Sequence, residues 1–127
     1  MSTYLLDTHV ILWHMTDDVQ LPEQFKQLIE NESHTVYISH VSLWEMAIKA
    51  SIGKLELLAP FPQLKLSLDK QGFHLLPFDY GVYETLLNLP FHHKDPFDRM
   101  LIAQAMVLGC PLLSVDKIFS QYPLPEI

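Results

Sequence analysis

The stretch HKDPFDRMLIAQAMVLGCPLLSVD, residues 93–116, holds the signals that decide the fold. Asp95 suits the N-cap of a helix, a proline follows at the first helical position, and Gly109 is a plausible stop, so we predict a helix over 96–108. The apolar run 111–115 then predicts a buried strand. A helix that leads directly into a buried strand is typical of an α/β protein.

The rest of the chain continues this alternation of helices and short apolar strands. We expect strands at 4–6, 35–39 and 73–76, and helices at about 10–15, 21–31, 42–51, 62–71, 79–87 and 116–121. This order predicts an α/β fold, a three-layer α/β/α sandwich around a central, mainly parallel sheet of about four to five strands with right-handed crossovers. No repeat, low-complexity segment or linker interrupts the pattern, so we expect one domain over 1–127.

The composition limits the classes of function. Hydrophobic residues make up 49% of the 127 positions and charged residues 18%, which argues for a folded globule with enough apolar surface to face a partner. The net charge of −7 argues against a protein that holds duplex DNA by electrostatics alone. A bound divalent cation or a local basic rim would offset the acids.

The compartment is indicated by what the sequence lacks. The single cysteine, Cys110, excludes an internal disulfide and fits a reducing environment. The apolar N-terminal run is interrupted by Asp7 and has no basic segment before it, so it predicts a first strand, not a signal peptide. No segment approaches the roughly 18 apolar residues that span a bilayer. We expect a soluble, cytoplasmic protein with no membrane partner.

Four acids fall where a parallel sheet binds its ligands. Asp7 directly follows the first predicted strand, and Asp116 directly follows the last. Asp98 lies in the first turn of helix 96–108, and Glu45 lies in the helix after the second strand. Ligands of an open parallel sheet bind beyond the carboxyl ends of its strands, so we expect these acids to surround one crevice.

Each acid also has a purely structural explanation. Asp7, Asp95 and Asp116 could each cap the helix that follows, and Glu45 could form a capping box with Ser42. Several acids gathered at one sheet edge would repel one another and raise each other's pKa values. A hard cation such as Mg²⁺ or Mn²⁺ would relieve that repulsion, because it prefers carboxylate oxygens. Bound there, it could activate a water and polarise a phosphoryl oxygen, which is the equipment for cutting a phosphodiester.

Three basic residues lie beside these acids in the sequence: Lys94, Arg99 and Lys117. They could hold a phosphate backbone. They could equally be surface counter-ions of the neighbouring acids, and the sequence leaves both explanations open.

At these residues the chain resembles PIN domains, and specifically the VapC-type toxins of bacterial toxin–antitoxin pairs. The resemblance rests on LLDTHVILW (5–13), on SLWEMAIKASIGKL (42–55) and on the stretch 93–116, in that order. Together these segments span most of the chain. The resemblance implies a PIN-like fold and a Mg²⁺- or Mn²⁺-dependent endoribonuclease that hydrolyses RNA, is inhibited by a cognate antitoxin protein and is usually a homodimer.

The resemblance also implies roles for individual acids. The catalytic and metal-binding acids of the family fall on Asp7, Glu45, Asp98 and Asp116. As a hypothesis, the three aspartates hold one or two divalent ions, and Glu45 completes the metal shell or orients the water that attacks the phosphodiester in line. Asp95 occurs in the branch with the DPFDR pattern; it either binds metal or only caps the helix, and we assign it provisionally to the cap.

The hydroxyl residue that the family often carries near its last acid would be Ser114. We regard it as a possible supporting residue of the site, together with Thr8, Lys94, Arg99 and Lys117.

Weaker signals have structural explanations that we prefer. His92 and His93 are adjacent, so they cannot form the one-face pair of a helical zinc site, and we expect loop or surface histidines. His9 could touch substrate, but a packed or capping role is favoured. Trp13, Trp44 and the methionines could stack on bases, but we expect them in the core.

Two rival functions remain. A phosphatase of the haloacid dehalogenase type also places an aspartate after its first strand, but it needs a second aspartate two residues later, where this chain has His9. A non-catalytic binding domain with the PIN fold would keep the architecture and some of the acids. The full set of four acids argues against that alternative.

Overall fold

The computed structural model describes residues 2–127, and within them four strands form a single sheet in the order β3-β2-β1-β4. The strands are β1 (Thr3–Leu6), β2 (Thr35–Ser39), β3 (His74–Leu76) and β4 (Leu112–Leu113). The helices are α1 (Thr8–Met15), α2 (Glu23–Glu30), α3 (His40–Ser51), α4 (Phe61–Lys70), α5 (Tyr80–Leu87) and α6 (Pro96–Leu108), followed by the short 3₁₀ helix η1 (Lys117–Gln121).

Every strand pair in the sheet is parallel, as predicted. Strand β1 lies in the middle, with Thr3 opposite Thr35 of β2 and Leu5 opposite Leu112 of β4. Strand β3 extends the sheet beyond β2. Since parallel strands run in one direction, the chain leaves all of them at the same edge, and the segments that follow them start there.

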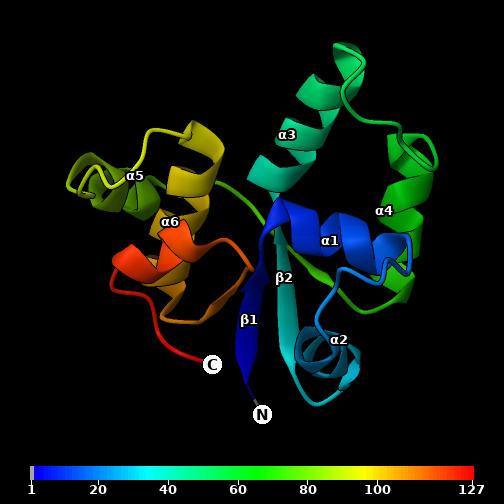
Figure 1. The fold of residues 1–127 in the computed structure, drawn as a ribbon, viewed down its shortest axis with the longest axis horizontal. Coiled ribbons are helices and arrows are strands. Elements are labelled where there is room, and N and C mark those ends of the chain that lie inside the picture. Colours follow the sequence, from blue (N-terminus) through cyan, green and yellow to red (C-terminus); the bar gives the residue numbers. More distant parts are fainter. Residues whose placement is uncertain (1) are drawn as a thin grey trace.

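Helices cover both faces of the sheet, which gives the predicted three layers (Figure 1). Side chains alternate along the central strand: Leu5 packs with α5, α6 and the C-terminal segment, whereas Tyr4 and Leu6 pack with α1, α2 and α4. The same alternation separates Leu112 from Leu113 in β4. Two apolar cores, one on each face, therefore hold the sheet in a fixed position.

The start of α3 differs from the prediction. The helix begins at His40, directly after β2, because the side chain of Ser39 accepts a hydrogen bond from the Val41 amide at 3.0 Å and caps it. Ser42 lies inside the first turn and is buried, so the capping box between Ser42 and Glu45, the alternative explanation of Glu45, does not form. The side chains of Ser42 and Glu45 instead contact the Thr8 hydroxyl, just after the end of β1.

The last strand is shorter than predicted, and other boundaries agree within one or two residues in most cases. Only Leu112 and Leu113 pair as β4, instead of the whole run 111–115, and the chain bends at Val115. The helix α6 covers the predicted range, and Gly109 ends it in the left-handed conformation at φ 67°. No helix within residues 2–127 is long and apolar enough to cross a membrane.

Truncation of the α6 core residue Leu101, which has no exposed surface, should destabilise the fold. We expect Leu101→Ala to lower the free energy of unfolding by about 2–5 kcal/mol, because it leaves a cavity between helix and sheet. Leu66→Ala is the matched control, since Leu66 on α4 is 67% exposed and its truncation should cost under about 0.5 kcal/mol. Urea unfolding of both variants measures the difference, and equal losses would contradict this packing.

Candidate active site

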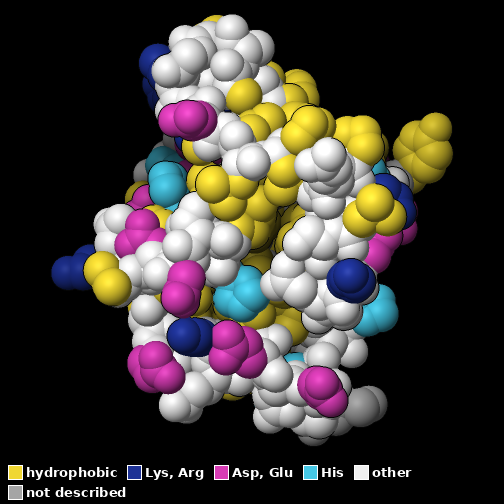
Figure 2. Space-filling view, turned by 90° about the vertical axis from the view of Figure 1, so that its right-hand side faces the viewer, with side chains coloured by type: hydrophobic (Ala, Val, Ile, Leu, Met, Phe, Trp, Pro, Cys, Tyr) yellow, Lys and Arg dark blue, Asp and Glu magenta, His cyan; other side chains and the backbone are white. Residues whose placement is uncertain are grey.

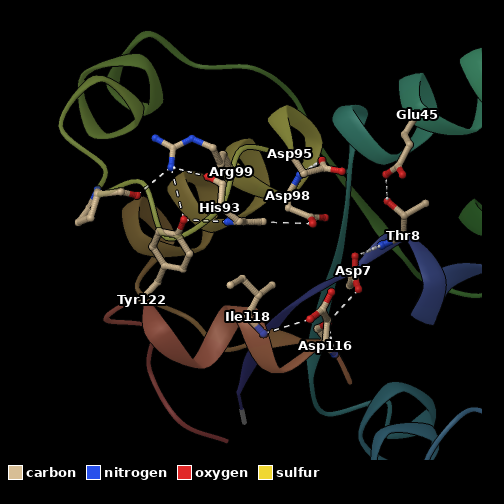
Figure 3. A network of polar contacts seen from close by, with 12 residues as sticks. Asp7, Thr8, Glu45, His93, Asp95, Asp98, Arg99, Asp116, Ile118 and Tyr122 are labelled. Atoms are coloured by element: carbon tan, nitrogen blue, oxygen red, sulfur yellow. Dashed lines mark hydrogen bonds and ion pairs between the residues drawn. The ribbon is translucent and has the colours of Figure 1, made fainter.

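The carboxyl edge of the sheet brings together the four acids singled out in the sequence. Figure 3 shows the carboxylates of Asp7, Glu45, Asp98 and Asp116 arranged around a common space. They come from the end of β1, from α3, from the first turn of α6 and from the segment after β4. Residues more than 100 positions apart in the chain, such as Asp7 and Asp116, thus meet at one place.

Asp7 is the most firmly held of the four acids. It is 5% exposed, and its carboxylate accepts hydrogen bonds from the Thr8 amide and from the Ser114 hydroxyl, both at 2.8 Å. Burial raises the pKa of Asp7, the bond from Ser114 works against that increase, and the negative charge of Glu45 adds to it. The side chain of Asp7 therefore has a fixed direction at the centre of the site.

Glu45 is buried beside Thr8. The Thr8 hydroxyl donates to one carboxylate oxygen of Glu45 at 2.8 Å and lies 2.9 Å from the Ser42 hydroxyl. Lys49 donates to the other carboxylate oxygen at 2.6 Å. Thr8, a possible supporting residue in the sequence analysis, is therefore in contact with a predicted catalytic acid.

Lys49 was missed by the sequence analysis. Its hydrogen bond to Glu45 raises the pKa of Lys49, with further contributions from the negative charges of Glu45, Asp95 and Asp98, so the ammonium lies within the acidic site. The spacing of four residues from Glu45 on one helix was the signal that could have found it.

Asp98 carries the strongest sign of crowded charge. Its pKa is raised to about 7, first by burial and then by the charges of Asp95, Asp7, Glu45 and Asp116. An acid with that pKa holds a proton near neutral pH unless a cation compensates the surrounding charge. The side chain is 21% exposed, so the carboxylate remains reachable from the site.

Asp95 caps α6, because its side chain accepts a hydrogen bond from the Asp98 amide at 3.0 Å. Asp116 caps η1 through the Ile118 amide, also at 3.0 Å. The Asp116 amide donates a hydrogen bond to the Ser114 hydroxyl at 3.1 Å. The same hydroxyl donates to the carboxylate of Asp7. Ser114 therefore links the segment after β4 to the carboxylate at the end of β1.

The three basic residues that neighbour the acids in sequence take different positions. Lys94 and Lys117 are exposed. Arg99 is only 5% exposed, and its guanidinium donates to the carbonyls of Leu89 and Pro90 at 3.1 and 2.8 Å. It lies away from the carboxylates in Figure 3, so the structure does not support the phosphate contact that the sequence left open for Arg99.

The aromatic residues also separate. Trp13 is partly buried against the core, as expected, but Trp44 is 55% exposed, and the core position predicted for it is wrong. Trp44 meets Phe97 edge to face at 5.3 Å, which joins α3 to α6 beside Glu45 and Asp98. His9 is exposed and therefore not packed in the core; its ring lies 5.9 Å from that of Trp13.

His93 is a second residue whose importance the sequence did not reveal. It was expected to be an ordinary loop or surface histidine, and His92 is indeed exposed. The side chain of His93 is only 16% exposed; its Nδ1 is 2.8 Å from the Tyr122 hydroxyl, and its Nε2 is 3.4 Å from Asp98 Oδ2. No spacing in the sequence connects these three positions.

The donor chemistry fits a hard divalent cation. The four predicted ligands offer carboxylate oxygens only, with neither thiol nor imidazole among them, and the neighbouring carboxylates add to the effect of burial in raising the pKa of Asp98. As they stand, residues 2–127 contain no ready-made cluster of three or more His, Cys, Asp or Glu side chains able to hold a metal ion. The carboxylates surround a shared space and do not touch one another (Figure 3).

Comparison with known families identifies the family of this chain. The model of the PIN domain family matches residues 4–124. The chain belongs to the PIN domain family. It is 26% identical over 127 residues to Ribonuclease VapC22 of Mycobacterium tuberculosis (strain ATCC 25618 / H37Rv), covering 99% of this chain and 96% of that protein.

Solved structures share the PIN fold. The crystal structure of DNA-bound VapBC from Salmonella typhimurium gives a TM-score of 0.72 at 20% identity, covering 100% of this chain and 97% of that chain. VapBC2 from Rickettsia felis, bound to a DNA fragment from its promoter, gives a TM-score of 0.71 at 16% identity, covering 95% of this chain and 93% of that chain. FitAB bound to the IR36 DNA fragment gives a TM-score of 0.60 at 20% identity, covering 90% of this chain and 85% of that chain.

The raised pKa of Asp98 predicts a pH dependence for the metal-free protein. The folded-state pKa of about 7 lies above the ordinary aspartate value of 3.8, so the unfolded chain loses this proton first and stability falls as pH rises from about 4 to about 7. Asp98→Asn should remove that loss, and at pH 8 it should be more stable than wild type by on the order of 1–3 kcal/mol.

Urea unfolding in EDTA at pH 5 and pH 8 measures this effect. Glu84→Gln, at an exposed position of α5, is the control and should follow the wild-type curve. If Asp98→Asn loses stability between pH 5 and pH 8 as steeply as wild type does, the assigned cause is wrong.

Proposed function

We propose that this chain is a Mg²⁺- or Mn²⁺-dependent endoribonuclease, the VapC-type toxin of a toxin–antitoxin pair. The observation that carries the proposal is the set of four carboxylates, from four separate segments, around one space at the sheet edge of a PIN domain (Figure 3). The similarity to Ribonuclease VapC22 over almost the whole chain supports the same activity.

In this proposal each acid has a role that its contacts suit. Asp7, Asp98 and Asp116 hold the cation, and the Ser114 hydroxyl keeps Asp7 pointed at it. When bound, the cation supplies positive charge that polarises the phosphodiester and makes a water more acidic. Glu45, fixed by Thr8, orients the attacking water in line with the leaving oxygen.

The positive charge at the site comes from Lys49, which the sequence analysis did not include among its three basic residues. Lys49 neutralises Glu45 and lies inside the acidic cluster, where it can meet a substrate phosphate. Lys94 and Lys117 are exposed next to Asp95 and Asp116 in the chain and remain proposed phosphate contacts. Arg99 is not part of this set, because carbonyl groups occupy its guanidinium.

The proposed partners follow from the family and from exposed apolar surface. An apolar hollow of about 360 Å³ lies between α3, α4 and the β3 edge, lined by residues such as Leu43, Phe61 and Leu68 (Figure 2). We propose that it receives an apolar segment of the cognate antitoxin. Exposed Tyr83 and Leu87 on α5 suit a homodimer contact. We also propose a cytoplasmic location, where RNA is available and the unpaired Cys110 stays reduced.

The rival functions have less support. The phosphatase needs an acid where this chain carries an exposed His9. A non-catalytic PIN-fold protein would not need Ser114 and Thr8 to fix the direction of Asp7 and Glu45. The experiments below separate both rivals from the nuclease.

Neutralising Asp7 should abolish RNA cleavage. Loss of an outer-shell partner of a metal ligand costs about 10–100-fold in activity or affinity, so loss of the central ligand in Asp7→Asn should cost at least about 100-fold. The assay incubates purified protein with total RNA and Mg²⁺ or Mn²⁺, with and without EDTA, and maps the new ends. The far-ultraviolet circular dichroism spectrum should remain that of wild type. Full activity of Asp7→Asn, or cleavage unaffected by EDTA, would refute the proposal.

The exposed Trp44 should bind an RNA base. Stacking of a base on an aromatic ring contributes about 1–3 kcal/mol, so Trp44→Ala should weaken RNA binding about 5-fold or more, whereas Trp44→Phe should retain most of it. Fluorescence anisotropy with a labelled RNA in Ca²⁺ measures binding without cleavage. If Trp44→Ala binds as tightly as Trp44→Phe, the pair of Trp44 and Phe97 only joins α3 to α6.

A further inference from the structure

The loop before α6 is tied to the helix by one buried cation. The Arg99 guanidinium donates to the carbonyls of Leu89 and Pro90 and, at 3.4 Å, to the carbonyl of His93. It also lies over the Phe91 ring, 3.9 Å from the ring centre. The loop that carries His93 therefore has a fixed position relative to the first turn of α6, where Asp98 lies.

The same guanidinium sets the direction of the next hydrogen bond. Arg99 donates to the Tyr122 hydroxyl oxygen at 3.4 Å, and arginine has no acceptor to offer in return. The hydroxyl proton of Tyr122 is then available for His93 Nδ1, at 2.8 Å. With Nδ1 accepting, the uncharged imidazole carries its proton on Nε2.

That Nε2 proton faces the acid site. Nε2 is shielded from solvent and has no aligned hydrogen-bond partner within residues 2–127, yet Asp98 Oδ2 lies 3.4 Å away. A small rotation of the carboxylate would complete the bond, and bulk solvent cannot reach the shielded nitrogen to compete for it. Figure 3 shows the whole sequence of contacts, from Arg99 through Tyr122 and His93 to Asp98.

We propose that His93 is a positioning residue of the nuclease site, which holds Oδ2 of Asp98 through its Nε2 proton and leaves the other carboxylate oxygen for the divalent cation. Tyr122 and Arg99 act through it by fixing the tautomer and the ring. The proposal rests on the proposed function, because it assigns Asp98 to the cation. It also gives Arg99 a role in the site without contact to the phosphate.

The test measures Mn²⁺ affinity of the full chain by isothermal titration calorimetry. Outer-shell partners of a metal ligand contribute about 10–100-fold in affinity, so Tyr122→Phe and His93→Leu should each bind Mn²⁺ about 10-fold more weakly than wild type. His93→Gln, whose amide can still donate to Asp98, should recover part of the loss. His92→Gln is the matched control: its exposed ring also contacts Tyr122, but the ion pair with Asp98 is made by His93, so this variant should bind like wild type.

The tautomer provides a second, metal-free measurement. At pH 8 in EDTA, ¹⁵N spectra of the histidine rings should show His93 protonated at Nε2 in wild type, and Tyr122→Phe should lose that preference. A wild-type His93 protonated at Nδ1 would overturn the proposal.

Other results are equally decisive. Affinities of Tyr122→Phe and His93→Leu within twofold of wild type would overturn the role of His93, and so would equal losses in His93→Leu and His93→Gln, which indicate packing alone. A wild-type chain that binds no Mn²⁺ would overturn the proposed function itself, and the role of His93 with it.

Discussion

The negative charges around Asp98 impose the main constraint on this protein. Burial raises its pKa most, and four other carboxylates, three of them from other parts of the chain, raise it further. The parallel sheet is the cause: the end of β1, the end of β4 and the start of α3 all lie at its carboxyl edge, where α6 also begins. Burial makes the repulsion stronger, because less water is present to screen it. The surrounding contacts can be understood as ways to hold these acids in place.

The acids differ in how they are held. Asp7 and Glu45 are the most buried, and each accepts hydrogen bonds from side-chain hydroxyls, Ser114 for Asp7 and Thr8 for Glu45. Lys49 forms an ion pair with Glu45. Within residues 2–127, the carboxylate of Asp98 has no hydrogen-bond or ion-pair partner nearer than His93 Nε2, at 3.4 Å. The charge that the protein leaves uncompensated is therefore concentrated between Asp7, Asp98 and Asp116, which is where a divalent cation would reduce the repulsion most.

The sequence was sufficient to predict the fold and the gathering of the acids, because both depend on local signals. Apolar runs predict the strands, caps and glycines predict the helix ends, and a parallel sheet then determines which edge the acids share. It was not sufficient where a side chain has two possible uses. Ser39 ends β2 and also caps α3, which moved the helix start away from Ser42. Arg99 follows Asp98 in the chain, but the carbonyls of a loop nine and ten residues earlier fix its direction. Only tertiary structure shows such partners.

Capping a helix and doing chemistry are not alternatives for these acids. In Asp7, Asp95 and Asp116, the Oδ1 atom accepts a hydrogen bond from a backbone amide of the following helix. A carboxylate has two oxygens, and a cap that occupies one of them fixes the plane in which the other lies. For Asp95 the effect is indirect, because its cap sets the backbone of Asp98 while its charge raises the Asp98 pKa. Helix capping is thus the means by which this fold aims carboxylates at the space they share, and Asp98, which caps nothing, needs His93 for the same purpose.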